Sequence, residues 1–308
     1  YKTLEAIFDR DAKKGDQHGQ CLFRSRFEWL DEQLTFDRRY LPRVDCRSYK
    51  GWRSLINAQS ISLVFASAFM DNPGSVYGHT FLKINREKGG QRLNLLDHVI
   101  QYQALPEDEL GLLYVLKGVF GGYRGFYPLD PYYIPIQNNI EYEDRSIWEY
   151  ELNLTDSEME RLLTHSWEMA HFYTSYYFFK QNCAYRILEL IEIAAPQYKF
   201  KDRFLFWAMP SQAVVHVLNE KGLVRQSNYF PARTRQLMQK FEGLEQEEKQ
   251  ILGELVQNPE VLDSEIFRQL TETQQIRVLD TALDFLRSRV NKDRDEPENK
   301  AYRRRSLL

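Results

Sequence analysis

The chain has 308 residues, 43% of them hydrophobic, which is enough to bury one large core or two modest ones. The chain has a net charge of -3 and thus no surplus of basic residues that could neutralise phosphates, so nucleic acid is not an expected partner. The longest apolar run, Ile61 to Met70, is far shorter than the roughly 20 residues of a membrane-spanning helix, and none is expected.

Residues 1–60 are polar, with scattered aromatic side chains and little regular period, and predict a loop-rich N-terminal wrap rather than a domain. Cys21 and Cys46 both lie in this segment, where a disulfide between them would tie it down. An even pair plus one cysteine left over, Cys183, suits an oxidising compartment. The alternative is that Cys21 and Cys46 are two unrelated reduced thiols.

Residues 61–103 predict a meander in a mostly antiparallel sheet. An apolar run of strand length (SISLVFASAFM) is followed by a turn cluster (DNPGS), an alternating strand (GHTFLKIN) and a third candidate strand (RLNLLDHVIQYQ). Residues 148–154 (WEYELNL) are a further strand candidate.

Residues 117–135 (KGVFGGYRGFYPLDPYYIP) are rich in glycine and aromatic residues, but the glycines lack the spacing of a phosphate-binding loop. Two interpretations remain: an ordinary loop anchored to the core by its rings, or a wall that lines a lipid or acyl site. The rings in question are those of Phe120, Tyr123, Phe126, Tyr127, Tyr132 and Tyr133.

The second half of the chain is predicted to be mainly helical. A capping box, Thr155 to Glu158, predicts a helix over 156–172. In KQNCAYRILELIE (180–192) apolar residues recur at helical spacing, Asn182 is a good N-cap, and Cys183 becomes the first helical residue. Further helices are predicted in PSQAVVHVLNEKG and TQQIRVLDTALDFLRSRV.

The position of Cys183 suits a nucleophile. Unsatisfied N–H groups and the positive end of the dipole at a helix N-terminus favour thiolate, and the same N–H groups can hold an oxyanion. His79 is the candidate base, because it opens a strand directly after a turn, where a sheet edge can aim an imidazole at a helix tip. The alternative is a buried structural Cys183 with unrelated histidines.

A third group should orient the imidazole of a Cys–His pair. Asp97 and Gln101 share one face of the third candidate strand by period two, whereas His98 points to the other face. Asp71 and Asn72, in the preceding turn, are the alternatives.

Four motifs, LVFASAFMDNPGSVYGHTFLKIN, LKGVFGGYRG, WEYELNLT and FFKQNCAYRILELIE, together resemble a bacterial envelope family whose members include the Lnb-type lipoprotein N-acyltransferases. The match covers roughly residues 60–225 in the family's order and spacing. The resemblance implies an α+β fold: a permuted papain/NlpC-like core in which an antiparallel sheet packs on a Cys-bearing helix, with extra C-terminal helices. It divides the chain into an N-terminal wrap (1–60), a thiol catalytic core (61–225) and a helical extension with a charged tail (226–308).

The resemblance also implies roles for single residues. His79 in GHTF would be the general base and Cys183 in NCAYR the nucleophile of a ping-pong acyl transfer. The acyl donor would be a glycerophospholipid and the acceptor an amine such as a lipoprotein N-terminus, with no cofactor or metal. The candidates for support and substrate binding are Asn182, Tyr185, Arg186, Asp71, Asn72, Ser75 and Tyr123.

Two departures from the family are visible. Gln101 stands where the family's third strand is expected to carry Asn, and the membrane-embedded C-terminal part of the Lnb enzymes has no counterpart in this chain. We therefore expect a periplasmic protein with peripheral membrane contact, attached through a region outside this sequence. The competing hypotheses are an NlpC-like thiol hydrolase of a peptidoglycan amide or lipid ester, and a non-catalytic envelope scaffold.

Overall fold

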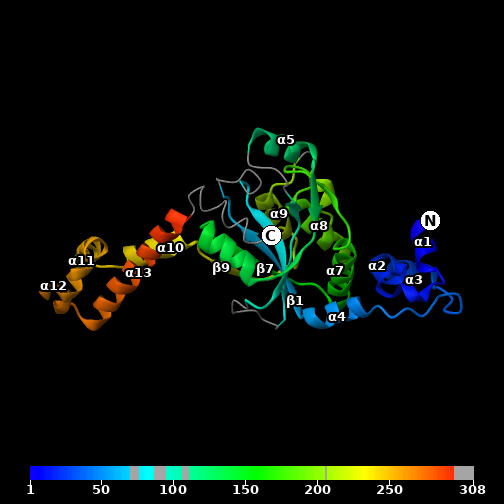
Figure 1. The fold of residues 1–308 in the computed structure, drawn as a ribbon, viewed down its shortest axis with the longest axis horizontal. Helices are drawn as coiled ribbons and strands as arrows, with labels where there is room; N and C mark the ends of the chain where they lie inside the picture. Colours follow the sequence, from blue (N-terminus) through cyan, green and yellow to red (C-terminus); the bar gives the residue numbers. More distant parts are fainter. Residues whose placement is uncertain (70–75, 87–94, 106–110, 205–206, 295–308) are drawn as a thin grey trace. The chain divides into compact units, whose positions relative to one another are not determined.

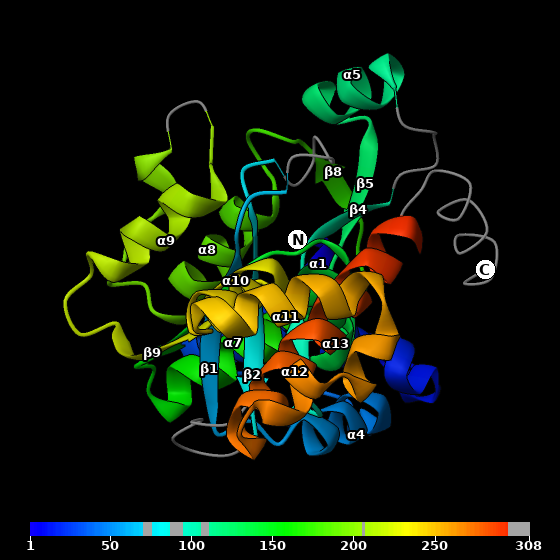
Figure 2. The ribbon, with the colours of Figure 1, turned by 90° about the vertical axis from the view of Figure 1, so that its left-hand side faces the viewer.

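The computed structural model describes residues 1–69, 76–86, 95–105, 111–204 and 207–294. These residues form two compact units, one comprising Tyr1–Pro135 with Trp148–Tyr229 and the other comprising Ile136–Ile147 with Phe230–Leu308. Figures 1 and 2 show the ribbon from two directions. The fold is α+β, with antiparallel strand pairs and several C-terminal helices, as predicted.

The first unit is built on a six-stranded sheet with the order β6-β3-β2-β1-β7-β9. Its central pair, β1 and β2, is antiparallel and pairs Ala66 with His79 and Ser60 with Asn85. A smaller sheet has the order β4-β5-β8. The strands are β1 (Ser60–Ala66), β2 (His79–Asn85), β3 (His98–Ile100), β4 (Gln103–Leu105), β5 (Tyr123–Phe126), β6 (Leu129–Pro131), β7 (Ile147–Leu152), β8 (Thr174–Tyr176) and β9 (Val224–Phe230).

Two helices carry the predicted motifs. α7 (Asp156–Met169) begins with the predicted capping box, in which Thr155 and Glu158 satisfy each other's N–H groups. α8 (Cys183–Ala194) begins at the predicted cysteine, with Asn182 as its N-cap. α8 packs against β2 and α7 through a buried face that holds it on the sheet. That face consists of Ala184, Ile187, Leu188, Leu190, Ile191 and Ala194.

The N-terminal segment is more regular than predicted. It contains α1 (Lys2–Ile7), α2 (Gly19–Leu22), α3 (Arg24–Leu34) and α4 (Arg47–Ile56), so the expectation that the segment is rich in loops is wrong. These helices are only 4 to 11 residues long. A helical period over so few residues is difficult to recognise in the sequence.

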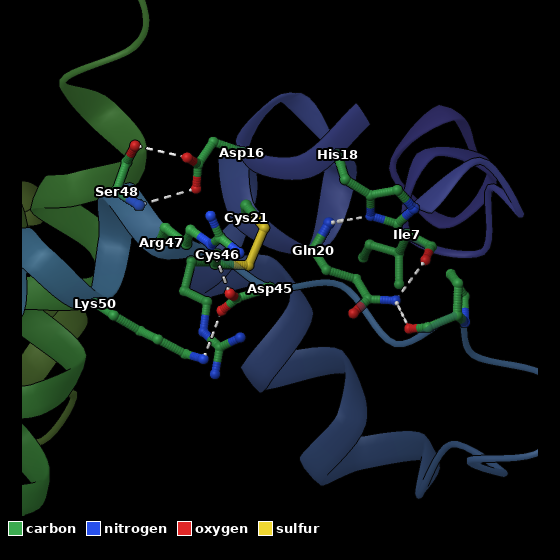
Figure 3. Close-up of a disulfide and its surroundings, with 12 residues drawn as sticks. Ile7, Asp16, His18, Gln20, Cys21, Asp45, Cys46, Arg47, Ser48 and Lys50 are labelled. Carbon is green, nitrogen blue, oxygen red and sulfur yellow. Dashed lines mark hydrogen bonds and ion pairs between the residues drawn. A yellow bond between two sulfur atoms is a disulfide. The ribbon is translucent and has the colours of Figure 1, made fainter. Parts of the chain in front are cut away.

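Figure 3 shows the predicted disulfide between Cys21 and Cys46, whose Cα atoms lie 5.3 Å apart. Both cysteines are buried beside Tyr49, and the Trp167 indole donates a 2.9 Å hydrogen bond to the Cys21 carbonyl. Because Trp167 belongs to α7, the disulfide lies where the N-terminal segment joins the rest of the unit. Cys183 is the free, buried cysteine.

We expect the double variant Cys21→Ser, Cys46→Ser to lose about 3 kcal/mol of unfolding free energy, because the closed loop restricts the unfolded chain. Urea denaturation under non-reducing conditions measures this loss. A variant as stable as the wild type would show that packing around Trp167 alone holds the segment.

The segment 117–135 is not the ordinary loop that was one interpretation of its sequence. It contains the end of α5 (Leu112–Phe120), β5, β6 and the start of α6 (Tyr133–Ile136). Its aromatic side chains differ in burial: Tyr123, Tyr127 and Tyr132 are buried, whereas Phe120 is 77% exposed. Anchoring by rings therefore holds for part of the segment only.

The second unit has its own hydrophobic core, made by Leu244, Ile251, Leu252, Leu255, Phe267, Leu270, Val278 and Ala282. Its helices are α10 (Arg233–Glu242), α11 (Gln246–Gln257), α12 (Glu265–Gln269) and α13 (Glu272–Arg294). The first unit also contains α9 (Pro210–Leu218) and two short 3-10 helices, Ala12–Gln17 and Lys201–Arg203. In the part of the chain that is described, no helix combines the length and apolar character needed to cross a bilayer.

Candidate thiol site

Asn182 fixes the start of α8. Its Oδ1 accepts a 3.2 Å hydrogen bond from the Tyr185 N–H, as an N-cap does. Its Nδ2 donates to the carbonyls of Phe178, at 3.0 Å, and Ala208, at 2.6 Å. Asn182 is buried, so these bonds hold two neighbouring segments against the first turn. The next residue, Cys183, is thereby held in one place.

The Cys183 side chain is 2% exposed. Burial raises the pKa of its thiol, but the charge and hydrogen bond of His79 and the N–H and hydroxyl of Thr80 lower it more strongly. The net effect lowers the pKa from the ordinary value of 9.0 to about 7. A buried thiol that is half ionised near neutral pH has the electronic requirement of a nucleophile.

His79 lies within hydrogen-bonding reach of Cys183, so the structure brings these two predicted residues together. It opens β2 opposite Ala66. The preceding Gly78 has φ +95°, and a Cβ there would lie 2.6 Å from the Phe65 ring and 2.8 Å from the Ala66 carbonyl oxygen. Only glycine fits this turn without strain, so the glycine in GHTF sets the direction from which His79 enters the strand.

Two residues that the sequence did not single out border the thiol. The Thr80 hydroxyl is buried and forms no other hydrogen bond within the described residues, so the Cys183 sulfur is its available acceptor. The Tyr176 hydroxyl accepts from the Cys183 N–H and also interacts with the thiol. Burial raises the pKa of Tyr176 well above its ordinary value, so this hydroxyl stays protonated and can donate.

Tyr176 is held by an aromatic stack. Its ring lies 5.2 Å from that of Tyr102 at an interplanar angle of 17°, and the Tyr102 hydroxyl bonds to Thr174 Oγ1 at 2.8 Å. A Cβ on Gly125 of the neighbouring strand would lie 2.1 Å from that hydroxyl. Gly125 therefore makes room for Tyr102, which in turn packs against Tyr176.

The two predicted orienting residues have other partners. The Gln101 amide donates to Asp130 at 3.2 Å, and the Asp97 carboxylate lies 3.6 Å from the Lys83 ammonium. Neither forms a hydrogen bond or ion pair with His79 among those of the described residues. The prediction that Asp97 or Gln101 orients the imidazole therefore finds no supporting contact.

Asp97 belongs to a buried ionic cluster on the sheet. Lys83 is 1% exposed and also binds Glu149, at 3.1 Å, which accepts a hydrogen bond from the Tyr132 hydroxyl. Burial raises the pKa of Asp97 although Lys83 acts to lower it. One cation thus lies against two buried carboxylates, which would leave a net charge of −1 if both were ionised.

Lys83→Met should cost about 3–5 kcal/mol of unfolding free energy at neutral pH, because Asp97 and Glu149 lose their cation. The loss should shrink as the pH falls, since an unpaired buried carboxylate escapes its penalty by taking a proton. Urea denaturation across the acidic range measures both effects. Equal stability of Lys83→Met and wild type at neutral pH would contradict the assigned role.

Two other predicted support residues, Arg186 and Tyr123, contact Tyr102 and Tyr176 respectively. Arg186 binds Glu189 at 2.7 Å and Gln181 at 3.0 Å, and its guanidinium lies 5.8 Å from the centre of the Tyr102 ring. Tyr123 pairs with Tyr176 across β5 and β8, so it supports the strand that carries Tyr176.

Tyr185 lines a cavity of about 80 Å³ beside the start of α8. The other lining residues are Lys180, Gln181, Lys201, Phe204 and Trp207. The remaining support candidates, Asp71, Asn72 and Ser75, lie outside the described residues. Their predicted roles stay predictions.

Comparison with known protein families finds two matches. The family described as the Lnb N-terminal periplasmic domain matches residues 48–220, which include Cys183 and His79. A domain of unknown function, DUF7842, matches residues 227–308. No curated protein and no solved structure matches the chain.

Proposed function

Because the chain belongs to the family of the Lnb N-terminal periplasmic domain and is thus a periplasmic envelope protein, we propose that it is a thiol-dependent acyltransferase. In this proposal Cys183 takes an acyl group from a glycerophospholipid and passes it to an amine, such as a lipoprotein N-terminus. The family assignment supports the envelope setting. The environment of Cys183 supports the thiol chemistry.

In the first half-reaction the Cys183 proton passes to His79 and the sulfur attacks the ester carbonyl carbon. The tetrahedral oxyanion would accept hydrogen bonds from the Tyr176 hydroxyl and the Cys183 N–H, which already lie together at the helix start. Collapse breaks the C–O bond of the ester. His79 returns its proton to the departing alkoxide, which leaves a lysophospholipid and an acyl thioester.

In the second half-reaction the acceptor amine attacks the thioester carbonyl carbon. His79 takes the amine proton, the C–S bond breaks, and the Cys183 thiolate leaves and recovers the proton. The products are an amide and the free enzyme. No oxidant, reductant or cofactor is needed for this balance.

The observation that carries the proposal is the pKa of the Cys183 thiol, about 7 in a site whose burial alone would raise it. A structural cysteine needs no such compensation. A buried thiol kept ionisable by a neighbouring imidazole is the arrangement that nucleophilic catalysis requires.

The test is product analysis with phospholipid vesicles and a diacylglyceryl-cysteine peptide bearing a free N-terminus. We expect equal amounts of lysophospholipid and N-acylated peptide from wild type, and neither from Cys183→Ala. Release of free fatty acid in place of the amide would show that the protein is a hydrolase rather than an acyltransferase. An absence of both products from wild type would overturn enzymatic turnover of these substrates.

A further inference from the structure

α5 presents an unusual apolar surface. Leu112 is 77% exposed, Leu113 57%, Leu116 44% and Phe120 77%, all within one nine-residue helix. The opposite side is anchored, because Tyr114 and Gly118 are buried. An isolated exposed leucine needs no explanation, but four large apolar side chains on one short helix form a patch that water solvates poorly.

The helix lies at one end of the first unit, above β4, β5 and β8 in Figure 2. It is joined tightly to the segment that leads to Cys183. A Cβ on Gly118 would lie 2.3 Å from the Phe178 ring, and one on Gly121 would lie 2.3 Å from the Tyr177 ring. The Phe178 N–H also donates a 2.8 Å hydrogen bond to the Gly118 carbonyl. Any surface that binds α5 would therefore also fix the position of residues 177–178, which lead into α8.

Exposed aromatic side chains also lie on and beside this segment. Phe179 is 36% exposed, and its ring lies 6.2 Å from that of Tyr77, which is 44% exposed. The Phe179 carbonyl accepts a 2.8 Å hydrogen bond from the Ala208 N–H, next to Trp207, which is 58% exposed. Tyr and Trp, whose rings carry a polar O–H or N–H group, are typical of the boundary between water and lipid.

Basic side chains border the aromatic part of this surface. Lys180 is exposed and lines the small cavity beside Trp207, together with Lys201. Arg124, on β5, is exposed as well and stacks over the Tyr173 ring at 5.9 Å. Cations beside exposed aromatic side chains match lipid headgroups, in which phosphate lies just outside the acyl region.

We propose that the exposed side of α5, together with Phe179 and Trp207, docks the first unit on the surface of a phospholipid bilayer. Leu112, Leu113, Leu116 and Phe120 enter the acyl boundary, and Lys180 contacts headgroup phosphates. Because α5 packs closely against Tyr177 and Phe178, the start of α8 then lies beside the membrane. This inference adds a membrane surface to the proposed function, on which it does not depend.

The test is flotation of the full chain with vesicles of phosphatidylethanolamine and phosphatidylglycerol. It is made in the Cys183→Ala background, so that acyl transfer cannot affect the result and the two proposals fail separately. We expect the protein to float, and the change Leu112→Gln with Leu116→Gln to weaken vesicle binding by roughly tenfold or more. Vesicles of phosphatidylcholine alone should bind the protein more weakly, because they lack the anionic lipid that attracts Lys180.

The matched control is Leu34→Gln with Leu55→Gln, two leucines that are each 57% exposed on other helices of the same unit. This control should float like the unchanged protein. Failure of the unchanged protein to float, or equal losses in the α5 and control variants, would overturn the proposal. So would a dimer, detected by light scattering without lipid, that the α5 change dissociates, because the surface would then bind a second copy.

Discussion

Alkylation of Cys183 by a small thiol reagent is expected to reach half its maximal rate at about pH 7 in the wild-type protein. The rate should rise with pH, because thiolate is the reacting form and the thiol loses its proton as the pH passes through its pKa. In His79→Ala the midpoint should move upward, since the imidazole that offsets burial is gone. A return to the ordinary pKa of 9.0 would slow alkylation at neutral pH about 50-fold.

His98→Ala is the matched control for this experiment, because His98 also lies on the main sheet but pairs with Ile84, away from the thiol. Its alkylation midpoint should equal that of the wild type. A wild-type midpoint near 9, or one that His79→Ala leaves unchanged, would show that His79 does not set the ionisation of Cys183.

Tyr176→Phe is expected to reduce kcat for acyl transfer by about 10²–10³-fold, the usual cost of removing one oxyanion donor. The ring remains and can keep its stack on Tyr102, so KM and stability should change little. Alkylation of Cys183 forms no oxyanion and should persist in the variant. Steady-state kinetics and alkylation, measured on the same preparation, separate a catalytic role from a structural one.

Tyr150→Phe provides the comparison, because Tyr150 lies on β7, packs on the main core and forms no hydrogen bond with Cys183 among those of the described residues. It should keep the wild-type kcat. If Tyr176→Phe instead lost alkylation and transfer equally, the hydroxyl would serve to build the site rather than to stabilise an oxyanion.

Local signals were sufficient for part of this architecture. The capping box at Thr155, the N-cap at Asn182 and the start of α8 at Cys183 all depend on residues within one helical turn. The disulfide could be predicted because the sequence contains only three cysteines, two of which lie in the same N-terminal segment. The pairing of His79 with Cys183 came from residue types and the family motif, and the structure brings the two together, while their catalytic roles stay predictions.

Other features depend on strand pairing that no local pattern records. Tyr176 is one of several tyrosines in FYTSYYFF, and only the β5–β8 register distinguishes it. Asp97 shares a strand face with Gln101, but the sequence does not show that Lys83, in an alternating strand, is buried and takes the carboxylate. The sequence around Gly125 is typical of a loop, and only the structure shows that Tyr102 occupies the space where a Cβ of residue 125 would lie.

Intact-mass spectrometry of the protein, after incubation with phospholipid vesicles and no acceptor amine, would detect an acyl group on Cys183. We predict one added fatty-acyl mass on wild type, absent from Cys183→Ala and reduced in His79→Ala. An unmodified wild-type protein whose Cys183 also resists a mild alkylating reagent would contradict this prediction, because the thiol would then be structural.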